Sequence, residues 1–223
     1  MAFHPVKAPG GDFDLGDLHE ANLAKRLAFL GLSDADAERL RALAPALRDF
    51  GDQFVEPFYD HLASFEETAK FLRDASLVER LKRLQLDHFE SMLEARWDES
   101  FVERLDRVGR VHADRGLQPQ FMLAAYFQHV EQCLDHFARD DDPRGGQSHA
   151  SVRSFLKAIF LDLGLTMEAY FAQSTQHQRQ ALDMYWKTNS ELRGFAELAS
   201  HDLKTPLATV ANLCDEALDE FGD

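Results

Sequence analysis

The stretch VGRVHADRGLQP, residues 108–119, decides the fold. It places His112 near the end of a helical pattern, follows it with the helix-stopping Gly116, and then with Pro119, which suits the first turn of a new helix. A single helical histidine that faces an apolar cavity is one way in which proteins hold haem iron from one side. The stretch therefore predicts two consecutive helices and one candidate axial ligand.

The composition favours helix throughout the chain. Its 223 residues include only nine valines and one isoleucine, so strand formers are scarce, whereas alanine and leucine favour helix. This length allows one or two domains. We predict an all-α protein.

Charge and cysteine content argue against several functions. A formal net charge of −15 repels nucleic acid and anionic lipid, and no apolar run approaches the roughly 20 residues that cross a bilayer. Cys133 and Cys214 form no metal or redox motif and fit a reducing compartment. Residues 1–11 lack the apolar core of a signal peptide. These features predict a cytoplasmic protein with no nucleic-acid or membrane partner.

Local signals divide the N-terminal part of the chain into a leader and two helices. Residues 1–16 predict a disordered leader, and residues 18–30 a short helix closed by Gly31. Ser33 is a typical N-cap for the next helix. Pro45 either kinks that helix or starts another one that runs to about residue 63.

Similar signals divide the middle of the chain. Ser76 and Glu79 have the spacing of a capping box for a helix over residues 75–93, and Asp98 predicts the start of the following helix. After the helix that begins at Pro119, residues 140–147 form the clearest break in the sequence.

The C-terminal part predicts one very long helix or two nearly continuous ones. No proline occurs between residues 148 and 205, and from residue 182 apolar positions alternate in steps of three and four, as in a coiled coil. The resulting seam consists of Leu182, Tyr185, Asn189, Leu192, Ala196, Ala199 and Leu203. Asn189 either fixes the register of a two-stranded coil or marks a weakly packed linker.

Four segments, in this order, resemble the globin-coupled sensors, a bacterial haem-sensor family. They are FYDHL (58–62), LKRLQLDHF (81–89), the stretch around His112, and PQFMLAAY (119–126). The resemblance covers roughly residues 23–137. It implies a globin fold with an extra N-terminal helix, a sensor domain over residues 17–178, haem b as cofactor and oxygen as ligand.

The resemblance also implies roles for individual residues. His112 would be the axial ligand of the haem iron, and Tyr59 the distal donor to the gas, while Leu81 and Leu84 would cover the gas-binding side. Each residue type also has an ordinary structural use. A lone helical histidine is more often a surface or core residue, Tyr59 could be an amphipathic core aromatic, and the leucines could be core packing. We interpret His61, His88, His129 and His136 as structural or surface residues.

The segment HDLKTP, residues 201–206, resembles the phosphoacceptor box of sensor histidine kinases. His201 would be the nucleophile that accepts a phosphoryl group, and Asp202 would hold the proton of its other ring nitrogen. Thr205 can orient this pair, and Pro206 removes a helical hydrogen bond beside it. We expect residues 179–223 to be a linker followed by the first helix of the kinase dimerisation domain.

The chain shows no nucleotide-binding lid or phosphate loop. We therefore expect it to be a truncated piece of a longer kinase that cannot phosphorylate itself, with ATP bound only by a catalytic domain outside this sequence. A response regulator would be the partner of the full-length protein.

Together these features predict a haem-based oxygen sensor that controls autophosphorylation of a histidine kinase at His201. We expect a homodimer formed by the last two globin helices, residues 119–139 and 148–175, and by the coiled coil over residues 180–221. Two alternatives stay open. The first is a globin module that senses redox state or haem itself, and the second is a haem-free helical dimerisation module.

Overall fold

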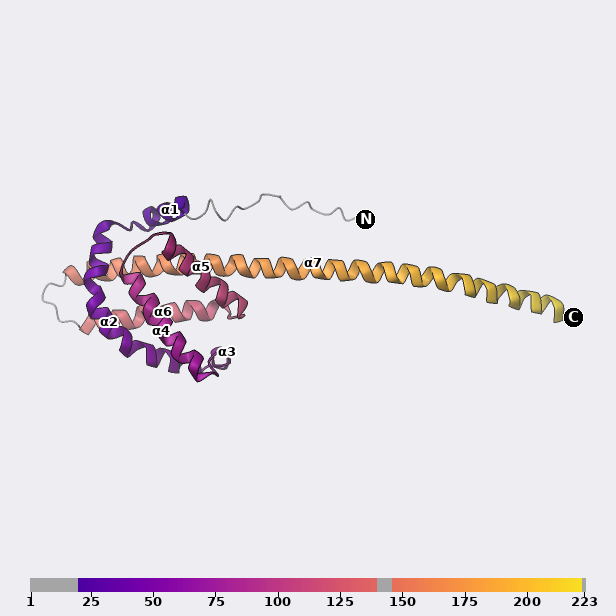
Figure 1. The fold of residues 1–223 in the computed structure, drawn as a ribbon, viewed down its shortest axis with the longest axis horizontal. Helices are drawn as coiled ribbons and strands as arrows, with labels where there is room; N and C mark the ends of the chain where they lie inside the picture. The colour runs from indigo at the N-terminus through magenta and orange to yellow at the C-terminus, as the bar shows by residue number, and fades with distance from the viewer. Residues whose placement is uncertain (1–19, 140–145, 222–223) are drawn as a thin grey trace. The chain divides into compact units, whose positions relative to one another are not determined.

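The computed structural model describes residues 20–139 and 146–221, and every element within these ranges is a helix (Figure 1). The prediction of an all-α protein is therefore confirmed. The helices are α1 (Glu20–Leu30), α2 (Asp34–Ala63), α3 (Glu66–Ala69), α4 (Ala75–Leu93), α5 (Glu99–Asp114), α6 (Pro119–Arg139) and α7 (Gly146–Phe221).

The chain divides into two units, residues 1–173 and 174–223. The first unit holds α1 to α6 and the first part of α7, and the second unit holds the rest of α7. The predicted leader, residues 1–16, and residues 140–145 of the predicted break lie outside the described part. In the described ranges, no helix is long and apolar enough to span a membrane.

Most helix ends follow from local sequence chemistry. Gly31 has a φ of +63° and closes α1, because glycine tolerates the left-handed backbone that ends a helix. Ser33 and Asp36 form a reciprocal capping box at the start of α2. Pro45 lies inside α2, so this helix continues through the proline. The structure thus decides between the two alternatives left open for that position.

The predicted capping box of α4 is wrong. The N-cap is Asp74, whose side chain accepts hydrogen bonds from the backbone N–H groups of Ser76 and Leu77. A carboxylate caps a helix at least as well as a serine hydroxyl, and Asp74 lies two residues upstream of the predicted cap. Glu79 instead pairs with Lys82 at 3.0 Å. The four-residue helix α3 was not predicted.

The ends of α5 and α6 match the sequence prediction. Asp98 caps α5 by accepting a hydrogen bond from the N–H of Phe101 at 3.0 Å. Gly116 has a φ of +69°, and α6 begins at Pro119. The histidine-bearing helix is therefore limited at both ends by residues that the sequence makes recognisable.

Three apolar clusters form the core of the first unit. One joins α2, α4, α6 and α7 around residues that include Leu40, Leu93 and Phe155. A second packs α1 and α5 against α7 through Phe101, Leu105 and Leu161, among others. The third gathers on α2 and contacts α4, and its buried members are Phe54, Val55, Phe58 and Tyr59.

Helix α5 crosses α7 at Gly109, in direct contact with its backbone. A Cβ atom at this glycine would overlap the carbonyl oxygen of Thr166 and lie 2.8 Å from both the Ala169 Cβ and the Tyr170 nitrogen. Only glycine allows such a close approach. The crossing therefore fixes the helix that carries His112 directly on α7.

The second unit is the remainder of one continuous helix, α7, which passes through Pro206 (Figure 1). The expectation of one very long helix is met by the 76 residues of α7. Large apolar side chains are exposed along it, among them Leu182, Tyr185, Leu192, Leu203 and Leu207.

Candidate functional site

His112 occupies the last turn of α5 and is partly exposed. Its Nδ1 lies 2.7 Å from the carbonyl oxygen of Val108, one helical turn earlier. A carbonyl can only accept, so Nδ1 carries the proton and donates it. The other ring nitrogen, Nε2, is then left with a lone pair, which is the form in which a neutral imidazole binds a metal.

The position of this imidazole is set by contacts of α5 with α7. Arg110, two residues before His112, donates a hydrogen bond to Gln173 at 3.1 Å and also pairs with Asp106 at 2.7 Å. After the helix ends, the carbonyl oxygen of Leu117 accepts a hydrogen bond from the Tyr170 hydroxyl at 2.7 Å. Together with the crossing at Gly109, these bonds hold both ends of the turn that carries His112.

Tyr59 is buried, with 8% of its surface exposed, and its ring meets that of Phe58 edge to face at 5.4 Å. Burial raises the pKa of Tyr59 to about 12, although Lys82 opposes this shift. The hydroxyl therefore stays protonated at neutral pH. Within the part of the chain that the structure describes, it has no hydrogen-bond partner. It is a hydrogen-bond donor whose ring packs against Phe58.

The two leucines differ in environment. Leu81 packs against the cluster that contains Phe58 and Tyr59, whereas Leu84 is 54% exposed. Val111, next to His112, is also exposed, at 48%. Ordinary core packing therefore accounts for Leu81 but not for Leu84. The structure brings Tyr59 and Leu81 together, while no described contact joins either of them to His112.

These residues fit the haem group that the sequence predicts. One histidine has its Nδ1 proton engaged and its Nε2 lone pair available, which suits a single axial bond to iron. Leu84 and Val111 present apolar surface of the kind that a porphyrin face requires. Among the described residues, no group of three or more His, Cys, Asp or Glu side chains could hold a bare metal ion.

Sequence reasoning missed a partly buried contact between α4 and α6. The His129 Nδ1 donates to the carbonyl oxygen of Ala125 at 2.6 Å, so its Nε2 accepts a hydrogen bond from the Gln85 amide at 2.7 Å. Its ring packs against Phe54 and Phe58, with centroids at 4.5 and 4.8 Å. Burial lowers the pKa of His129 to about 4, so this imidazole stays neutral. Gln85 lies one turn after Leu81, and that spacing was the available signal.

The predicted phosphoacceptor residues belong to the second unit. The side chain of His201 is 82% exposed, and its Nδ1 lies 3.4 Å from an oxygen of Asp202. The backbone carbonyl of Thr205 accepts a hydrogen bond from Thr209 at 3.0 Å. His201 is thus accessible on a helix that continues through Pro206.

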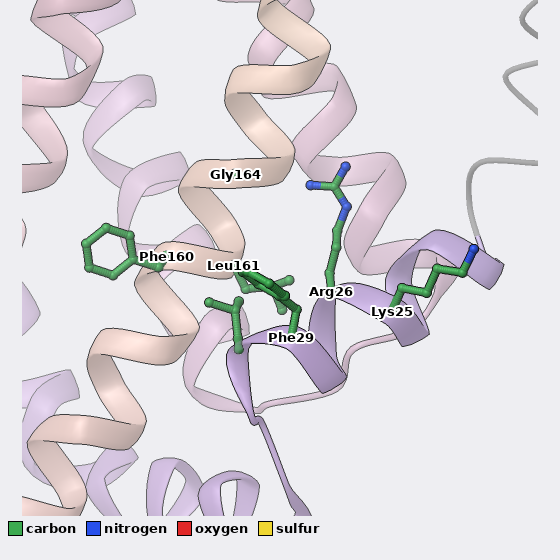
Figure 2. Close-up of a pocket in the computed structure, with 7 residues that line it drawn as sticks. Lys25, Arg26, Phe29, Phe160, Leu161 and Gly164 are labelled. Carbon is green, nitrogen blue, oxygen red and sulfur yellow. The ribbon is translucent and has the colours of Figure 1, made fainter.

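A surface hollow of about 380 Å³ lies between α1 and α7, and Figure 2 shows its lining. Phe29 and Phe160 contribute its aromatic part, while Lys25 and Arg26 lie on α1. None of the predicted site residues lines this hollow, so it is separate from the candidate haem site.

The helical fold and the family match together place this protein in the globin class. The chain belongs to the Protoglobin family, whose family model matches residues 19–176. It is 30% identical, over 196 residues, to the "Heme-based aerotactic transducer HemAT" of Halobacterium salinarum. That alignment covers 86% of this chain but only 40% of the length of the relative.

Two solved structures share the fold. The globin domain of the Geobacter sulfurreducens globin-coupled sensor matches with a TM-score of 0.62 and 24% identity, over 66% of this chain and 96% of that domain. The ferrous globin domain of E. coli DosC matches with a TM-score of 0.54 and 13% identity, over 67% of this chain and 99% of that domain. The predicted globin fold is confirmed by these matches.

Proposed function

We propose that this chain is a haem-based sensor of oxygen or another diatomic gas, with His112 as the axial ligand. The observation that carries the proposal is the hydrogen bond from the His112 Nδ1 to Val108, which leaves Nε2 available. Membership of the Protoglobin family and the similarity to a transducer named as heme-based support the same function. Haem b, when bound, supplies the iron at which the gas is taken up.

The residues of this chain would then act on two sides of the haem, the axial side and the gas-binding side. Val108 holds the His112 ring in one orientation and increases the basicity of its Nε2. Tyr59, which stays protonated, would donate a hydrogen bond to oxygen and favour it over the less polar carbon monoxide. Leu81 and Leu84 would exclude water from the gas.

Absorption spectroscopy tests this function directly. We expect the purified protein, oxidised, reduced, and reduced under oxygen or carbon monoxide, to give haem spectra that change with the gas. His112→Ala should lose or severely weaken the haem spectrum. His61→Ala is the matched control, because His61 is a helical histidine of the same unit whose ring packs on Phe65 at 5.0 Å.

Three results would contradict the proposal. A colourless protein that cannot be reconstituted with haemin would leave a haem-free helical dimerisation module. A His112→Ala variant that binds haem as tightly as the wild type would move the axial ligand elsewhere. Rapid oxidation of the iron in air, combined with weak oxygen affinity, would favour a redox- or haem-sensing module over an oxygen sensor.

We also propose that residues 17–178 form the sensor domain and that residues 179–223 connect it to a histidine kinase. The HDLKTP segment supports this output, because His201 is exposed and lies beside Asp202 on one helix. An exposed imidazole is what a separate ATP-binding catalytic domain must reach. ATP and a response regulator would be partners of the full-length protein.

The output is tested by phosphorylation in trans. A histidine-kinase catalytic domain supplied with ATP should transfer an acid-labile phosphoryl group to His201, located by mass spectrometry. His201→Gln should abolish the transfer, whereas His177→Gln, which changes another histidine of α7, should not. Phosphate on neither histidine would restrict the function to sensing with an output of a different type.

A homodimer is part of the same proposal. Exposed aromatic side chains on the last two globin helices support it, among them Phe127, Phe160 and Phe171. Exposed leucines of α7 after residue 180 have the coiled-coil spacing. Sedimentation equilibrium should give a dimer for the wild type, and Phe171→Glu combined with Leu192→Glu should weaken it. A monomer at all concentrations would contradict this part.

A further inference from the structure

A carboxylate with no solvent exposure, Asp162, lies on α7 in the interior of the first unit. Two side chains from other helices reach it. The Tyr126 hydroxyl of α6 donates a hydrogen bond to Oδ1, and the His88 Nε2 of α4 lies 3.1 Å from Oδ2. The hydroxyl of Thr166, one turn further along α7, lies 3.2 Å from the Tyr126 hydroxyl. One buried acid therefore joins three helices.

The charges in this cluster are consistent with an ion pair. Burial lowers the pKa of His88, but the nearby Asp162 carboxylate outweighs it, so the net pKa shift is upward. Among the described residues the Asp162 Oδ2 accepts no hydrogen bond of normal geometry, so its contact with His88 is one of charge and proximity. Burial and the adjacent Asp162 raise the pKa of Tyr126 well above its usual value, so the phenol stays a donor. A buried carboxylate would be costly without such partners, and removing one of them leaves an uncompensated charge.

The cluster is connected to the gas-binding side through α4. His88 lies one turn after Leu84 and two turns after Leu81, and therefore on the same face of that helix. The Nδ1 atom of His88 is buried and has no hydrogen-bond partner among the described residues. Its contact with Asp162 is a polar attachment of this face of α4 to α7. Gln85, between these positions, attaches α4 to α6 through His129.

The same segment of α7 also meets the axial side. The backbone of Thr166 lies against Gly109, three residues before His112 on α5. Asp162 and Thr166 lie on adjacent turns of α7. Contacts from α4, on the proposed distal side, and from α5, on the proposed axial side, therefore reach α7 within four residues of each other. Helix α7 then continues without a break to residue 221.

We propose that Asp162 is a positioning residue for the gas-binding side, which fixes Leu81 and Leu84 over the gas by holding α4 on α6 and α7 through His88 and Tyr126. This inference rests on the proposed haem-sensing function.

The test uses two variants of the cluster and one control. Asp162→Asn removes the charge at constant shape, and Tyr126→Phe removes only a hydroxyl group. Asp87→Asn is the matched control, because Asp87 is an exposed carboxylate on α4 next to His88. We would measure oxygen dissociation from the reduced protein and the stretching frequency of bound carbon monoxide. Hydrogen exchange of the α4 amides in the haem-free protein gives a readout independent of the cofactor.

We expect both cluster variants to keep the haem spectrum, to lose oxygen about tenfold faster, and to shift the carbon monoxide frequency. Their α4 amides should exchange faster than those of the wild type, and Asp87→Asn should change none of these quantities. If Asp162→Asn fails to fold, Tyr126→Phe decides, because it leaves the ion pair in place.

Two negative results are distinguishable. A wild-type protein with no haem spectrum would refute the proposed function. A wild-type protein that binds haem and oxygen, with folded cluster variants whose oxygen dissociation and carbon monoxide frequency are unchanged, would refute only the positioning role. The Asp162 cluster would then be a structural ion pair.

Discussion

Gly109 of α5 lies directly against the backbone carbonyl of Thr166 on α7, at a distance that no larger residue permits. This contact occurs one turn before His112. The helix that carries the candidate axial ligand therefore cannot move closer to α7 at that point. Backbone contact of this kind transmits displacement directly, because packed interiors deform little.

We predict that Gly109→Ala destabilises the first unit by about 2 kcal/mol, in spite of the higher helix propensity of alanine. The added methyl group would overlap Thr166 and crowd Ala169 and Tyr170, and the overlapping atom of Thr166 is backbone and cannot turn away. Chemical denaturation followed by circular dichroism measures the change as a shift in the transition midpoint.

Gly164→Ala is the matched control for this prediction. It lies on α7 in the same unit, and of the residues that the structure describes, only Arg26 would come within 4 Å of a Cβ atom there, at 3.9 Å. It should stabilise the protein by about 0.5–1 kcal/mol. If the two alanine variants changed stability equally, the tight crossing at Gly109 would be refuted.

The sequence was sufficient for features that depend on neighbouring residues. Gly31, Ser33, Asp98 and Gly116 mark helix ends because the chemistry of capping and of left-handed backbone is local. The helix over residues 75–93 was predicted with the correct bounds, but its N-cap was misassigned, because Asp74 and Ser76 both qualify as caps and only the backbone geometry decides between them.

Features that depend on distant residues could not be predicted. Asp162 is 36 residues from Tyr126 in sequence and 74 from His88, and nothing near it signals that it is buried. The partner of the His112 Nδ1 was also unknown from sequence, although it proved to be local. The assignments of His112 and Tyr59 stay predictions that the spectroscopic experiments must test.

The coiled-coil seam of the second unit stays a prediction. Its predicted positions Leu182 and Leu203 are exposed apolar residues, but so are Trp186, Phe195 and Leu198, which lie beside the seam. A two-stranded coil covers only a narrow stripe, so the exposed surface is wider than the predicted seam requires. Exposure along this helix therefore does not separate the predicted seam from its neighbours.

Asp36 should be a major contributor to the stability of the first unit. It is 2% exposed, and its carboxylate accepts hydrogen bonds from Ser33 on α2's N-cap, from Arg39, and from Ser154 and Lys157 on α7. Asp36→Ala should cost about 3 kcal/mol, because it leaves buried donors and two cations without their partner. Thermal and chemical unfolding would measure the loss.

Asp34→Ala is the corresponding control. Asp34 is exposed in the same first turn of α2 and interacts mainly with the helix dipole, so its loss should cost at most about 1 kcal/mol.

The pKa of Asp36 is lowered, because the hydrogen bonds that surround its carboxylate outweigh burial, which alone would raise the pKa. Its contribution is therefore present above pH 3.8 and is lost as the pH falls below that value. Equal losses of stability in Asp36→Ala and Asp34→Ala would contradict the role assigned to Asp36.

Acidification should destabilise the first unit through His129. Its pKa is lowered by burial from 6.5 to about 4, so between these values the unfolded chain binds a proton that the folded chain does not. The contribution of His129 to stability is therefore greatest above pH 6.5 and falls as the pH drops toward 4, by about 3 kcal/mol in total. Unfolding free energies measured across this range should show the slope.

His129→Phe should reduce that slope, because phenylalanine fits beside Phe54 and Phe58 and does not titrate. Gln85 is only half-buried and can turn its amide to water. An unchanged slope in this variant would assign the acid sensitivity to other groups.

Tyr59→Phe should separate ligand chemistry from folding. The Tyr59 hydroxyl has no partner within the described residues, so its removal should change the unfolding free energy by no more than about 0.5 kcal/mol. If Tyr59 donates to oxygen, the variant should lose oxygen about tenfold faster, whereas carbon monoxide dissociation should change little. Stopped-flow kinetics measure both rates.

Tyr185→Phe, which alters an exposed tyrosine of the second unit, is the control and should behave as the wild type. Equal acceleration for both gases would instead indicate a general opening of the site and would exclude a hydrogen bond specific to oxygen.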